Sequence, residues 1–204
     1  MDISDVKDYT ITDDKYTYPR SNVLRNKFNI RNSELLEEQE VFFTSLRLLE
    51  LNLKPLRGKL DFNYLKKIHK YIFQDCYDFA GKIRKVDIQK GSSKFCITRY
   101  IQIQGEEIFE KLGKENYFKN YKYDEFCEKL AYFMGDLISL HPFREGNGRA
   151  NREFFRILCL KAGYDLDYSN FEKKDILEAD IACFNLDIEP MLKLMKNGLV
   201  KKIK

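Results

Sequence analysis

Apolar residues recur at helical spacing along most of this chain. The first row follows Ser33, which is predicted to cap a helix over 33–52, and consists of Leu36, Phe43, Leu46, Leu49 and Leu53. A second row follows Asp61, another predicted cap, and consists of Leu65, Ile68, His69, Ile72, Phe73 and Cys76. The same spacing predicts later helices at about 101–113, 124–140, 172–184 and 188–196. A further helix is predicted to follow the Gly-Asn-Gly turn at 146–148 and to run to about 162.

One stretch has the two-residue period of a β-strand. Val86 and Ile88 precede a Gly-Ser-Ser turn, and Phe95 and Ile97 follow it, which predicts a β-hairpin over about 84–98. An isolated hairpin is marginally stable, so this one either lies on the helices or pairs with a partner strand. The sequence therefore predicts a mainly α fold, a helical bundle with one β-hairpin.

The 204 residues suit one domain with short ends. Residues 1–20 are polar and are expected to form an extended arm that packs through Tyr16, Tyr18 and Pro19. Residues 21–190 hold the helical pattern and the hairpin. Residues 191–204 are expected to be the end of the last helix and a solvated basic tail.

The composition is that of an ordinary soluble protein, with 44% hydrophobic residues, 33% charged residues and a net charge of +4. Acidic and basic residues are interspersed, so no binding of nucleic acid is expected. No apolar run approaches the roughly 20 residues that span a bilayer, and residues 1–10 lack the features of a signal peptide. We therefore expect a cytoplasmic protein that does not bind membranes.

Cysteine usage points to a reducing environment. The five cysteines are widely spaced, odd in number and never form a CxxC pair. They are predicted to be reduced, small core residues, and not disulfides or a zinc site. They are Cys76, Cys96, Cys127, Cys159 and Cys183.

The candidate chemistry lies within residues 141–152. Gly146, Asn147 and Gly148 can adopt backbone conformations in which successive N–H groups converge on an anion, where the apolar pattern indicates the start of a helix. Arg149 and Arg152 lie three positions apart, hence on one face of its first turn. Guanidinium groups match phosphate oxygens well, so the pattern predicts a phosphate site.

Two further groups complete this site. Glu145 precedes the glycines and is placed to hold Mg²⁺, which takes one or two protein carboxylates together with phosphate and water. His141 is the nearby group that can accept a proton near neutral pH. The other histidine of the chain, His69, lies on an apolar row and is predicted to be a hydrogen-bonded core residue. A Gly-Asn-Gly turn alone would indicate only a turn or a helix cap.

The string HPFREGNGRANR matches the signature HxFx(D/E)GNGRxxR at every defined position, so the chain resembles the Fic family. Two upstream stretches, YPRSNVLRNKFNI at 18–30 and FQDCYDFAGKIRKVDIQKG at 73–91, are similar to stretches of bacterial Fic toxins. Phe79 stands where the family usually has Trp, and Arg20 where it often has Gly. The resemblance covers roughly 18–190.

The resemblance implies a Fic-type bundle that transfers AMP from ATP, with Mg²⁺, to a Ser, Thr or Tyr hydroxyl of a target protein. His141 would be the base, Glu145 would hold the metal, and the Gly146–Gly148 turn with both arginines would hold the phosphates. The hairpin would be the flap on which the target docks by strand addition. Its docking residues would be Asp87, Ile88, Gln89, Lys90, Gly91, Phe95, Cys96 and Ile97.

Other functions stay open on the same residues. The scaffold could transfer UMP, phosphate or phosphocholine, although Gly148 favours nucleotidyl transfer because the phosphate-transferring death-on-curing relatives carry Lys there. It could also be a non-enzymatic module that holds a nucleotide. Intact His141 and Glu145 argue against that module, because pure binding needs no general base.

The resemblance also raises a question of control. Fic enzymes are commonly inhibited by the motif (S/T)xxxE(G/N), whose Glu pairs with the second motif arginine, here Arg152. The nearest match runs from Ser33 to Glu37, but Glu38 stands where Gly or Asn is expected. We therefore expect a bacterial toxin restrained in trans by a small antitoxin that contacts Arg152. Self-inhibition through Ser33 and Glu37 is the alternative.

Overall fold

The computed structural model describes residues 15–201, apart from residues 92 and 170. The described residues form seven α-helices, two short 3-10 helices and two small antiparallel sheets. The predicted mainly α fold is therefore confirmed. The α-helices are α1 (Ser33–Leu53), α2 (Phe62–Phe73), α3 (Ile101–Lys114), α4 (Tyr123–Leu140), α5 (Asn147–Ala162), α6 (Lys173–Phe184) and α7 (Glu189–Gly198), and the 3-10 helices are η2 (Thr98–Tyr100) and η3 (Asn116–Phe118).

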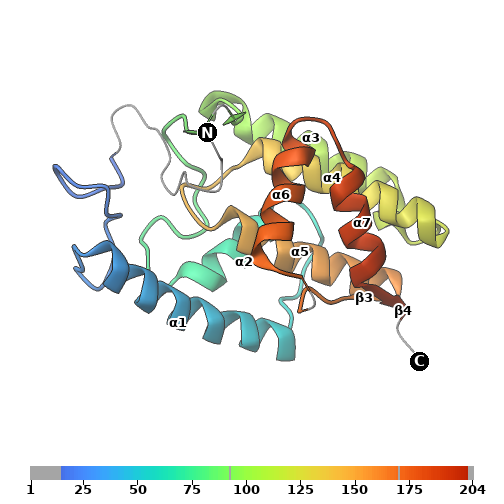
Figure 1. Cartoon of the computed structure of the whole chain (residues 1–204), viewed down its shortest axis with the longest axis horizontal. Coiled ribbons are helices and arrows are strands. Elements are labelled where there is room, and N and C mark those ends of the chain that lie inside the picture. Colours follow the sequence, from blue (N-terminus) through green and yellow to red (C-terminus); the bar gives the residue numbers. More distant parts are fainter. Residues whose placement is uncertain (1–14, 92, 170, 202–204) are drawn as a thin grey trace.

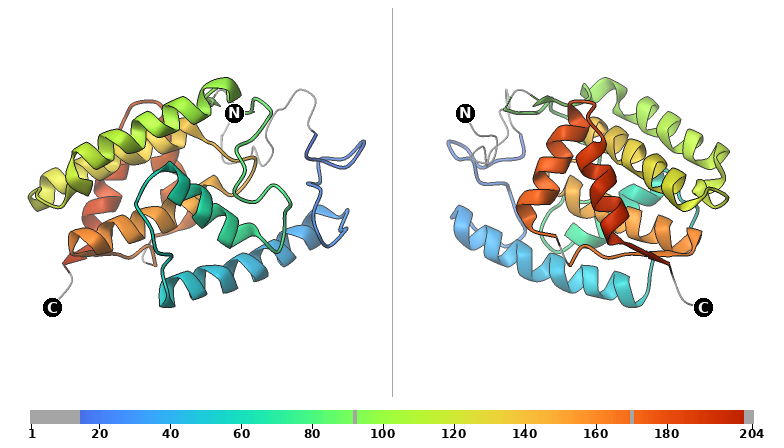
Figure 2. Two further views of the ribbon diagram at one scale, coloured as in Figure 1. Left: turned by 180° about the vertical axis from the view of Figure 1, so that it is seen from behind. Right: turned by 45° about the vertical axis from the view of Figure 1, so that its right-hand side comes forward.

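Helix α5 lies at the centre of the bundle and carries the second half of the sequence motif. It packs against α2 and α4, while α1 lies on the outer side of α2, and α3 packs on α4 (Figure 1). Helices α6 and α7 pack on each other and on α4, as the turned views also show (Figure 2). The start of α5 is thus surrounded by elements from both halves of the chain.

The predicted hairpin is present but short. Strand β1 (Gln89–Lys90) pairs with β2 (Ser93–Lys94), and the register sets Gln89 opposite Lys94. Val86 and Ile88 are buried, whereas Ile97 is 46% exposed. The hairpin lies on the helical body through Phe95, whose ring stacks on His141 at the end of α4.

A second small sheet was not predicted. Strand β3 (Tyr164–Leu166) directly follows α5 and pairs with β4 (Leu199–Lys201), which directly follows α7. Residues 199–201 thus form a strand that was not expected, and Leu199 is buried, whereas Val200, which is 60% exposed, and Lys201 are solvated as expected. Residues 202–204 lie outside the described residues.

Helix α1 has the predicted length but buries a different face. Leu46, Leu49 and Leu53 are 45%, 56% and 80% exposed, whereas the buried residues of this helix are Leu36, Glu40, Thr44 and Leu51. The predicted cap is also wrong, because the side chain of Asn32, and not of Ser33, accepts the hydrogen bond from Leu35 N. Helix α2, by contrast, has Asp61 as its cap, as predicted.

The part of the N-terminal arm that is described packs as expected through its tyrosines. Tyr16 meets Phe79 edge to face, with ring centroids 5.2 Å apart, and Tyr18 lies beneath the guanidinium of Arg31. Pro19 is exposed, so its predicted packing is wrong. The rest of the predicted arm, 1–14, lies outside the described residues.

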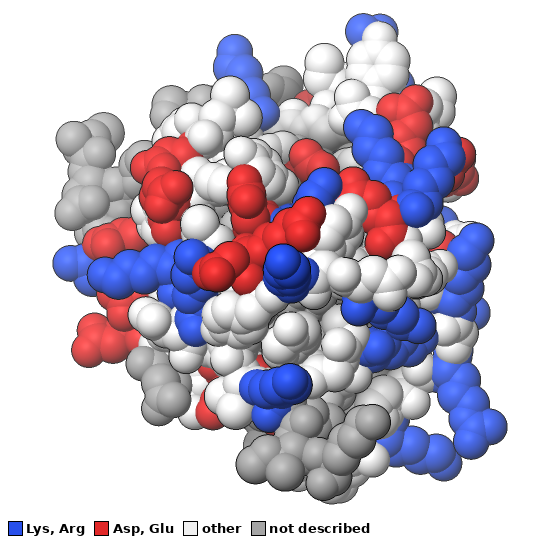
Figure 3. Space-filling view, turned by 90° about the vertical axis from the view of Figure 1, so that its right-hand side faces the viewer, with Lys and Arg blue, Asp and Glu red and all other residues white. Residues whose placement is uncertain are grey.

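All five cysteines are free thiols, and four are buried, as predicted; Cys96 is half-buried. Among the helices of the described ranges, none is long and apolar enough to cross a membrane. The face shown in Figure 3 carries acidic and basic side chains interleaved.

Candidate functional site

A cavity of about 190 Å³ lies where the hairpin, the motif and the last two helices meet. One end is polar and is lined by motif residues, namely His141, Asn147, Gly148, Asn151 and Arg152. The other end is mostly apolar and is lined by residues of α6 and α7, including Ile176, Leu177, Ile181, Met191 and Leu194. The hairpin adds Lys90, Ser93 and Phe95. This arrangement suits a ligand with one charged end and one apolar end.

His141 stands at the C-terminal end of α4 in a backbone conformation that is uncommon for a residue with a Cβ. Its φ is 42°, in the left-handed region, and its N–H donates to Leu137 O at 3.1 Å. The ring of Phe95 stacks on its imidazole, with centroids 3.8 Å apart. Burial, reinforced by the positive charge of Arg84, lowers the pKa of His141 from 6.5 to about 3. The imidazole is therefore neutral at physiological pH and able to accept a proton.

The motif loop is held by internal hydrogen bonds. The side chain of Asn147 accepts from Phe143 N at 2.9 Å and donates to Phe143 O at 2.8 Å. Asn147 lines the cavity, as expected for a phosphate site, but both ends of its side-chain amide are used within the loop. What it offers to a ligand is its backbone N–H, in the unpaired first turn of α5.

His69 is a core residue, as predicted. It is fully buried, its Nε2 lies 2.8 Å from Glu145 O, and its Nδ1 accepts from Gly81 N at 2.8 Å. The second bond requires an unprotonated Nδ1, which leaves the proton on Nε2. Its ring also stacks on Phe143 at 3.8 Å. His69 thus stabilises the motif loop through its contacts with Glu145 and Phe143.

The first glycine of the motif is required by space as well as by backbone conformation. Gly146 has a φ of 79° at the N-terminus of α5, and a Cβ there would lie 2.1 Å from Cζ of Phe73. Gly148 is less constrained, because a Cβ there would meet the end of the Arg152 side chain at 3.0 Å. The structure thus gives Gly146 a packing role and places Gly148 at the cavity.

The two motif arginines are predicted to share one face of α5, but their side chains point in different directions. Arg149 turns toward α1, where its Nη2 is 2.6 Å from Glu40 Oε1 and its Nη1 donates to Thr44 Oγ1 at 3.3 Å. Arg152 lines the cavity, and in the described part of the chain it has neither a hydrogen bond nor an ion pair. Of the two motif arginines, Arg152 is therefore the one whose charge is available inside the cavity, where Lys90 of the hairpin adds a second positive charge.

Glu145 lies next to Arg149 and, unlike Asn147 and Gly148, is not among the residues that line the cavity. Its Oε1 accepts from Gly146 N at 2.8 Å and lies 3.6 Å from Arg149 Nη2. Burial, and then the negative charge of Glu40, raise its pKa. Within the described ranges no cluster of three or more His, Cys, Asp and Glu could hold a metal ion. A single carboxylate fits Mg²⁺ only when phosphates and water supply the other ligands.

Several residues of the site escaped sequence analysis. Tyr168 OH and Asn151 Oδ1 are buried without a hydrogen-bond partner in the described structure, and both residues line the cavity. Asp180 faces the same space, and burial raises its pKa to about 6. The one available signal concerned α1, where Glu40 and Thr44 continue the spacing of Leu36 at intervals of four. A polar pair in a buried row indicates a charged partner.

Comparisons with known proteins agree with this geometry. The sequence model of the Fic/DOC family matches residues 59–159. A relative from Escherichia coli, named probable protein adenylyltransferase Fic, is 38% identical over 161 residues, which cover 79% of this chain and 80% of that protein. The chain belongs to the Fic/DOC family. The resemblance drawn from the motif is thereby confirmed.

Other members of the Fic/DOC family match over more of the chain. The protein adenylyltransferase VbhT of Bartonella schoenbuchensis is 36% identical over 196 residues, which cover 96% of this chain but only 41% of VbhT. The probable protein adenylyltransferase y4lH of Sinorhizobium fredii is 35% identical over 184 residues, 90% of this chain and 94% of that protein. This chain therefore spans less than half the length of VbhT but nearly all of y4lH.

Solved structures of Fic domains share the fold. The Fic domain of a Bartonella quintana effector protein with bound ADP superimposes with a TM-score of 0.85 at 29% identity, covering 92% of this chain and 95% of that one. BepC of Bartonella tribocorum with bound AMPPNP also superimposes with a TM-score of 0.85, at 26% identity, and the match covers 92% of this chain and 97% of BepC. The Fic-type bundle is therefore confirmed over nearly the whole described chain.

Proposed function

We propose that this chain transfers AMP from ATP to a Ser, Thr or Tyr hydroxyl of a target protein. One observation carries the proposal: a neutral His141 and an unpaired Arg152 face the same cavity. The names of the relatives, which are protein adenylyltransferases, support it. So do the adenine nucleotides named for the related structures.

The reaction follows from the groups at the polar end of the cavity. The target hydroxyl oxygen attacks the α-phosphorus of ATP while its proton passes to the His141 imidazole. The bond between the α-phosphorus and the bridging oxygen breaks, and pyrophosphate leaves with that electron pair. Arg152 and the backbone amides at the start of α5, from Asn147 and Gly148, bind phosphate oxygens. Arg149 adds positive charge nearby while it stays bound to Glu40.

Mg²⁺ is the metal that this reaction would use, and Glu145 is the residue that would hold it together with the phosphates. When bound, the ion would supply positive charge against the leaving pyrophosphate. Glu145 suits this role because its carboxylate lies at the start of α5, where it accepts from Gly146 N at 2.8 Å, next to the backbone amides that would bind the phosphates.

The apolar end of the cavity would hold the nucleoside. Its aliphatic side chains from α6 and α7 suit the faces of a base. Asn151 Oδ1 is an acceptor without a partner in the described structure, so it can receive a hydrogen bond from an amino group or a hydroxyl. Asn151 lies among the motif residues at the polar end, so a nucleotide that spans both ends would satisfy this buried acceptor.

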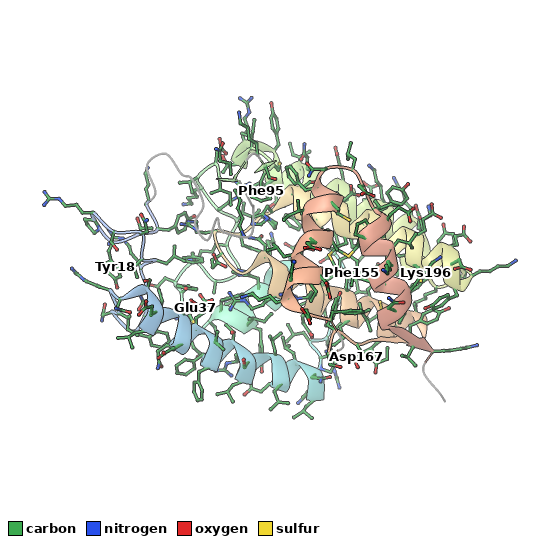
Figure 4. All side chains as sticks on the ribbon, viewed as in Figure 1. Tyr18, Glu37, Phe95, Phe155, Asp167 and Lys196 are labelled. Atoms are coloured by element: carbon green, nitrogen blue, oxygen red, sulfur yellow. The ribbon has the colours of Figure 1, made fainter. Side chains whose placement is uncertain are left out.

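The partners are part of the proposal. The target would add a strand to the hairpin, whose docking residues run from Asp87 to Gly91 and from Phe95 to Ile97. Phe95 directly follows strand β2 (Figure 4). Its ring stacks on the His141 imidazole, so a strand docked on the hairpin would lie beside the base. A bacterial toxin acting in the cytoplasm, held in check by an antitoxin at Arg152, is the setting that we propose.

Labelled ATP tests the reaction. We expect label from the α-phosphate, and not from the γ-phosphate, to enter a protein of a bacterial lysate, and mass spectrometry to show an added AMP. Label from the γ-phosphate, or an added UMP or phosphocholine mass with the other donors, would replace AMP transfer by another reaction on this scaffold. His141→Ala should bind ATP and transfer nothing. If it keeps the biological effect, the chain is a binding module.

A further inference from the structure

Arg84 is a fully buried arginine just ahead of the hairpin, outside the cavity lining. Its side chain is 0% exposed. Its Nε donates to His141 O at 2.8 Å, its Nη1 donates to Val86 O at 2.8 Å, and its Nη2 donates to Cys96 O. One guanidinium thus joins the carbonyl of the proposed base to carbonyls on both sides of the hairpin.

The backbone reinforces the same connection. Arg84 N donates to Pro142 O at 2.9 Å, and Cys96 N donates to Ser139 O at 3.0 Å. The segment before β1 and the segment after β2 are therefore each bonded to the end of α4. A shift of the hairpin relative to this end would break bonds on both sides.

The hairpin also contacts the side chain of His141. Arg84 binds the main-chain carbonyl of His141, and Phe95 stacks on its imidazole with an interplanar angle of 22°. The left-handed conformation of His141, with φ 42° and ψ 61°, sets the direction of that carbonyl, and Arg84 stabilises this direction with a charge-assisted hydrogen bond. A lysine has no planar fork that could bind three carbonyls at once.

We propose that Arg84 is a positioning residue that couples the seating of the hairpin to the orientation of the His141 imidazole. The proposal rests on the proposed function, in which His141 is the base and the hairpin docks the target. A target strand that straightens or shifts the hairpin would act on His141 through Arg84. Docking and proton transfer would then be linked by a path that does not pass through ATP.

The charge of Arg84 gives a second, separable effect. Four charged groups face His141. Arg84 lies just ahead of the hairpin, and the other three line the cavity, namely Lys90 of β1, Arg152 and Asp180. Burial lowers the pKa of His141 to about 3, and the charge of Arg84 is the next cause. Loss of that charge should raise the pKa toward 6.5, whereas a lysine that keeps the charge should not.

Two variants separate geometry from charge. Arg84→Lys should lower kcat for target modification by about 100-fold, the size expected for a misplaced catalytic group, with KM for ATP unchanged. Arg84→Gln should lower kcat similarly and also move the acid limb of the kcat profile to higher pH. Arg156→Lys is the matched control, because Arg156 also donates to a backbone carbonyl, that of Leu51, but lies in the second half of α5 and does not line the cavity. It should leave kcat and the pH profile unchanged.

Equal kcat in Arg84→Lys and the wild type would overturn the geometric part. The pKa of His141 can be measured in the wild type and in Arg84→Gln by NMR of the imidazole nitrogens. The same pKa in both proteins would overturn the charge part. These NMR spectra need no turnover, so they remain valid if the wild type proves to transfer something other than AMP. The labelled-ATP experiment on the wild type reports that separate failure.

Hydrogen exchange of the wild type gives a further test, which does not depend on whether a variant folds. If Arg84 couples the two segments, the amides of Cys96 and His141 should exchange hydrogen with the same opening free energy, because they open together. Their acceptors are Ser139 O and Leu137 O, respectively. If the Cys96 amide exchanges at least about tenfold faster, the hairpin opens on its own and the coupling is refuted.

Discussion

The guanidinium of Arg149 and the carboxylate of Glu40 lie 2.6 Å apart and join the start of α5 to α1. Tyr77 OH also donates to Glu40, and the Arg149 guanidinium lies 4.6 Å from the centre of the Phe73 ring. The pair is largely buried, with 23% and 11% of the two side chains accessible. Removal of Glu40 would leave the Arg149 guanidinium with only the more distant carboxylate of Glu145, 3.6 Å away.

We expect Glu40→Ala to destabilise the fold by about 3 kcal/mol, the lower end of the range for a broken buried pair, because Arg149 keeps some access to water. Urea unfolding measures this. Glu110→Ala is the control: it breaks an ion pair with Lys114 whose side chains are 64% and 72% exposed, and should cost less than about 1 kcal/mol. Equal effects of the two variants would show that the Glu40 pair is not a structural link.

The two rows of leucines on α1 give a second prediction. Leu51 is fully buried and Leu49 is 56% exposed, so Leu51→Ala should cost about 2–5 kcal/mol and Leu49→Ala less than about 1 kcal/mol. Both changes have the same effect on helix propensity, so the difference measures burial alone. The reverse order would restore the face that the spacing of the leucines predicted.

The error on α1 shows what spacing can and cannot determine. The sequence contains two rows of apolar residues on this helix, and periodicity does not say which one faces the core. The buried row includes Glu40 and Thr44, whose side chains both bind Arg149, more than 100 positions later. The cap Asp61, in contrast, was predictable because a cap depends on residues a few positions away, although the same reasoning chose Ser33 where the cap is its neighbour Asn32.

Long-range relationships account for the other differences. Strands β3 and β4 are only three residues each, and each is stabilised by the other, so neither has a local signal of its own. The divergence of Arg149 and Arg152 likewise depends on Glu40 on one side and the cavity on the other. The motif itself was predictable because its residues are close together in the sequence.

The two glycines at the ends of α5 form a matched pair. Both have positive φ, 79° at Gly146 and 93° at Gly163, but a Cβ would strike Phe73 only at Gly146. Gly163→Ala should cost about 1–2 kcal/mol, the penalty of a left-handed residue with a Cβ. Gly146→Ala should cost clearly more, because Phe73 must move as well. Thermal unfolding of both variants checks this, and similar melting temperatures would mean that Phe73 yields without cost.

With only two histidines in the chain, NMR of the imidazole nitrogens can follow each one. Burial lowers the pKa of His69 and of His141 to about 3, so neither should titrate between pH 8 and pH 5. His69 should show a protonated Nε2 and an unprotonated Nδ1 throughout. A midpoint near 6.5 for His69 would contradict its burial.

The same lowered values make the fold less stable in acid. Below pH 6.5 the unfolded chain binds a proton at each histidine, whereas the folded chain does not until about pH 3. The contribution is therefore complete above pH 6.5 and declines as the pH falls, by up to about 1.4 kcal/mol per pH unit for each histidine. The raised pKa of Asp180, about 6, acts in the opposite direction over part of this range.

The last prediction concerns control, and it follows from where the acidic residues of α1 lie. Glu37 is exposed near the N-terminus of α1 (Figure 4). Among the residues that the structure describes, it has neither a hydrogen bond nor an ion pair. Arg152 faces the cavity on the side of α6. The carboxylate of α1 that reaches a motif arginine is that of Glu40, and it reaches Arg149. Glu37 therefore does not have the contact that self-inhibition requires.

We accordingly expect the isolated chain to transfer AMP when purified, to be toxic when expressed without a partner, and to be inhibited in trans at Arg152. Glu37→Gly should change the rate little. Glu38→Gly is the control, because it is equally exposed and carries the same penalty of about 1 kcal/mol for glycine in a helix. If Glu37→Gly raises the initial rate of AMP transfer manyfold and Glu38→Gly does not, the chain carries its own inhibitory glutamate and needs no antitoxin.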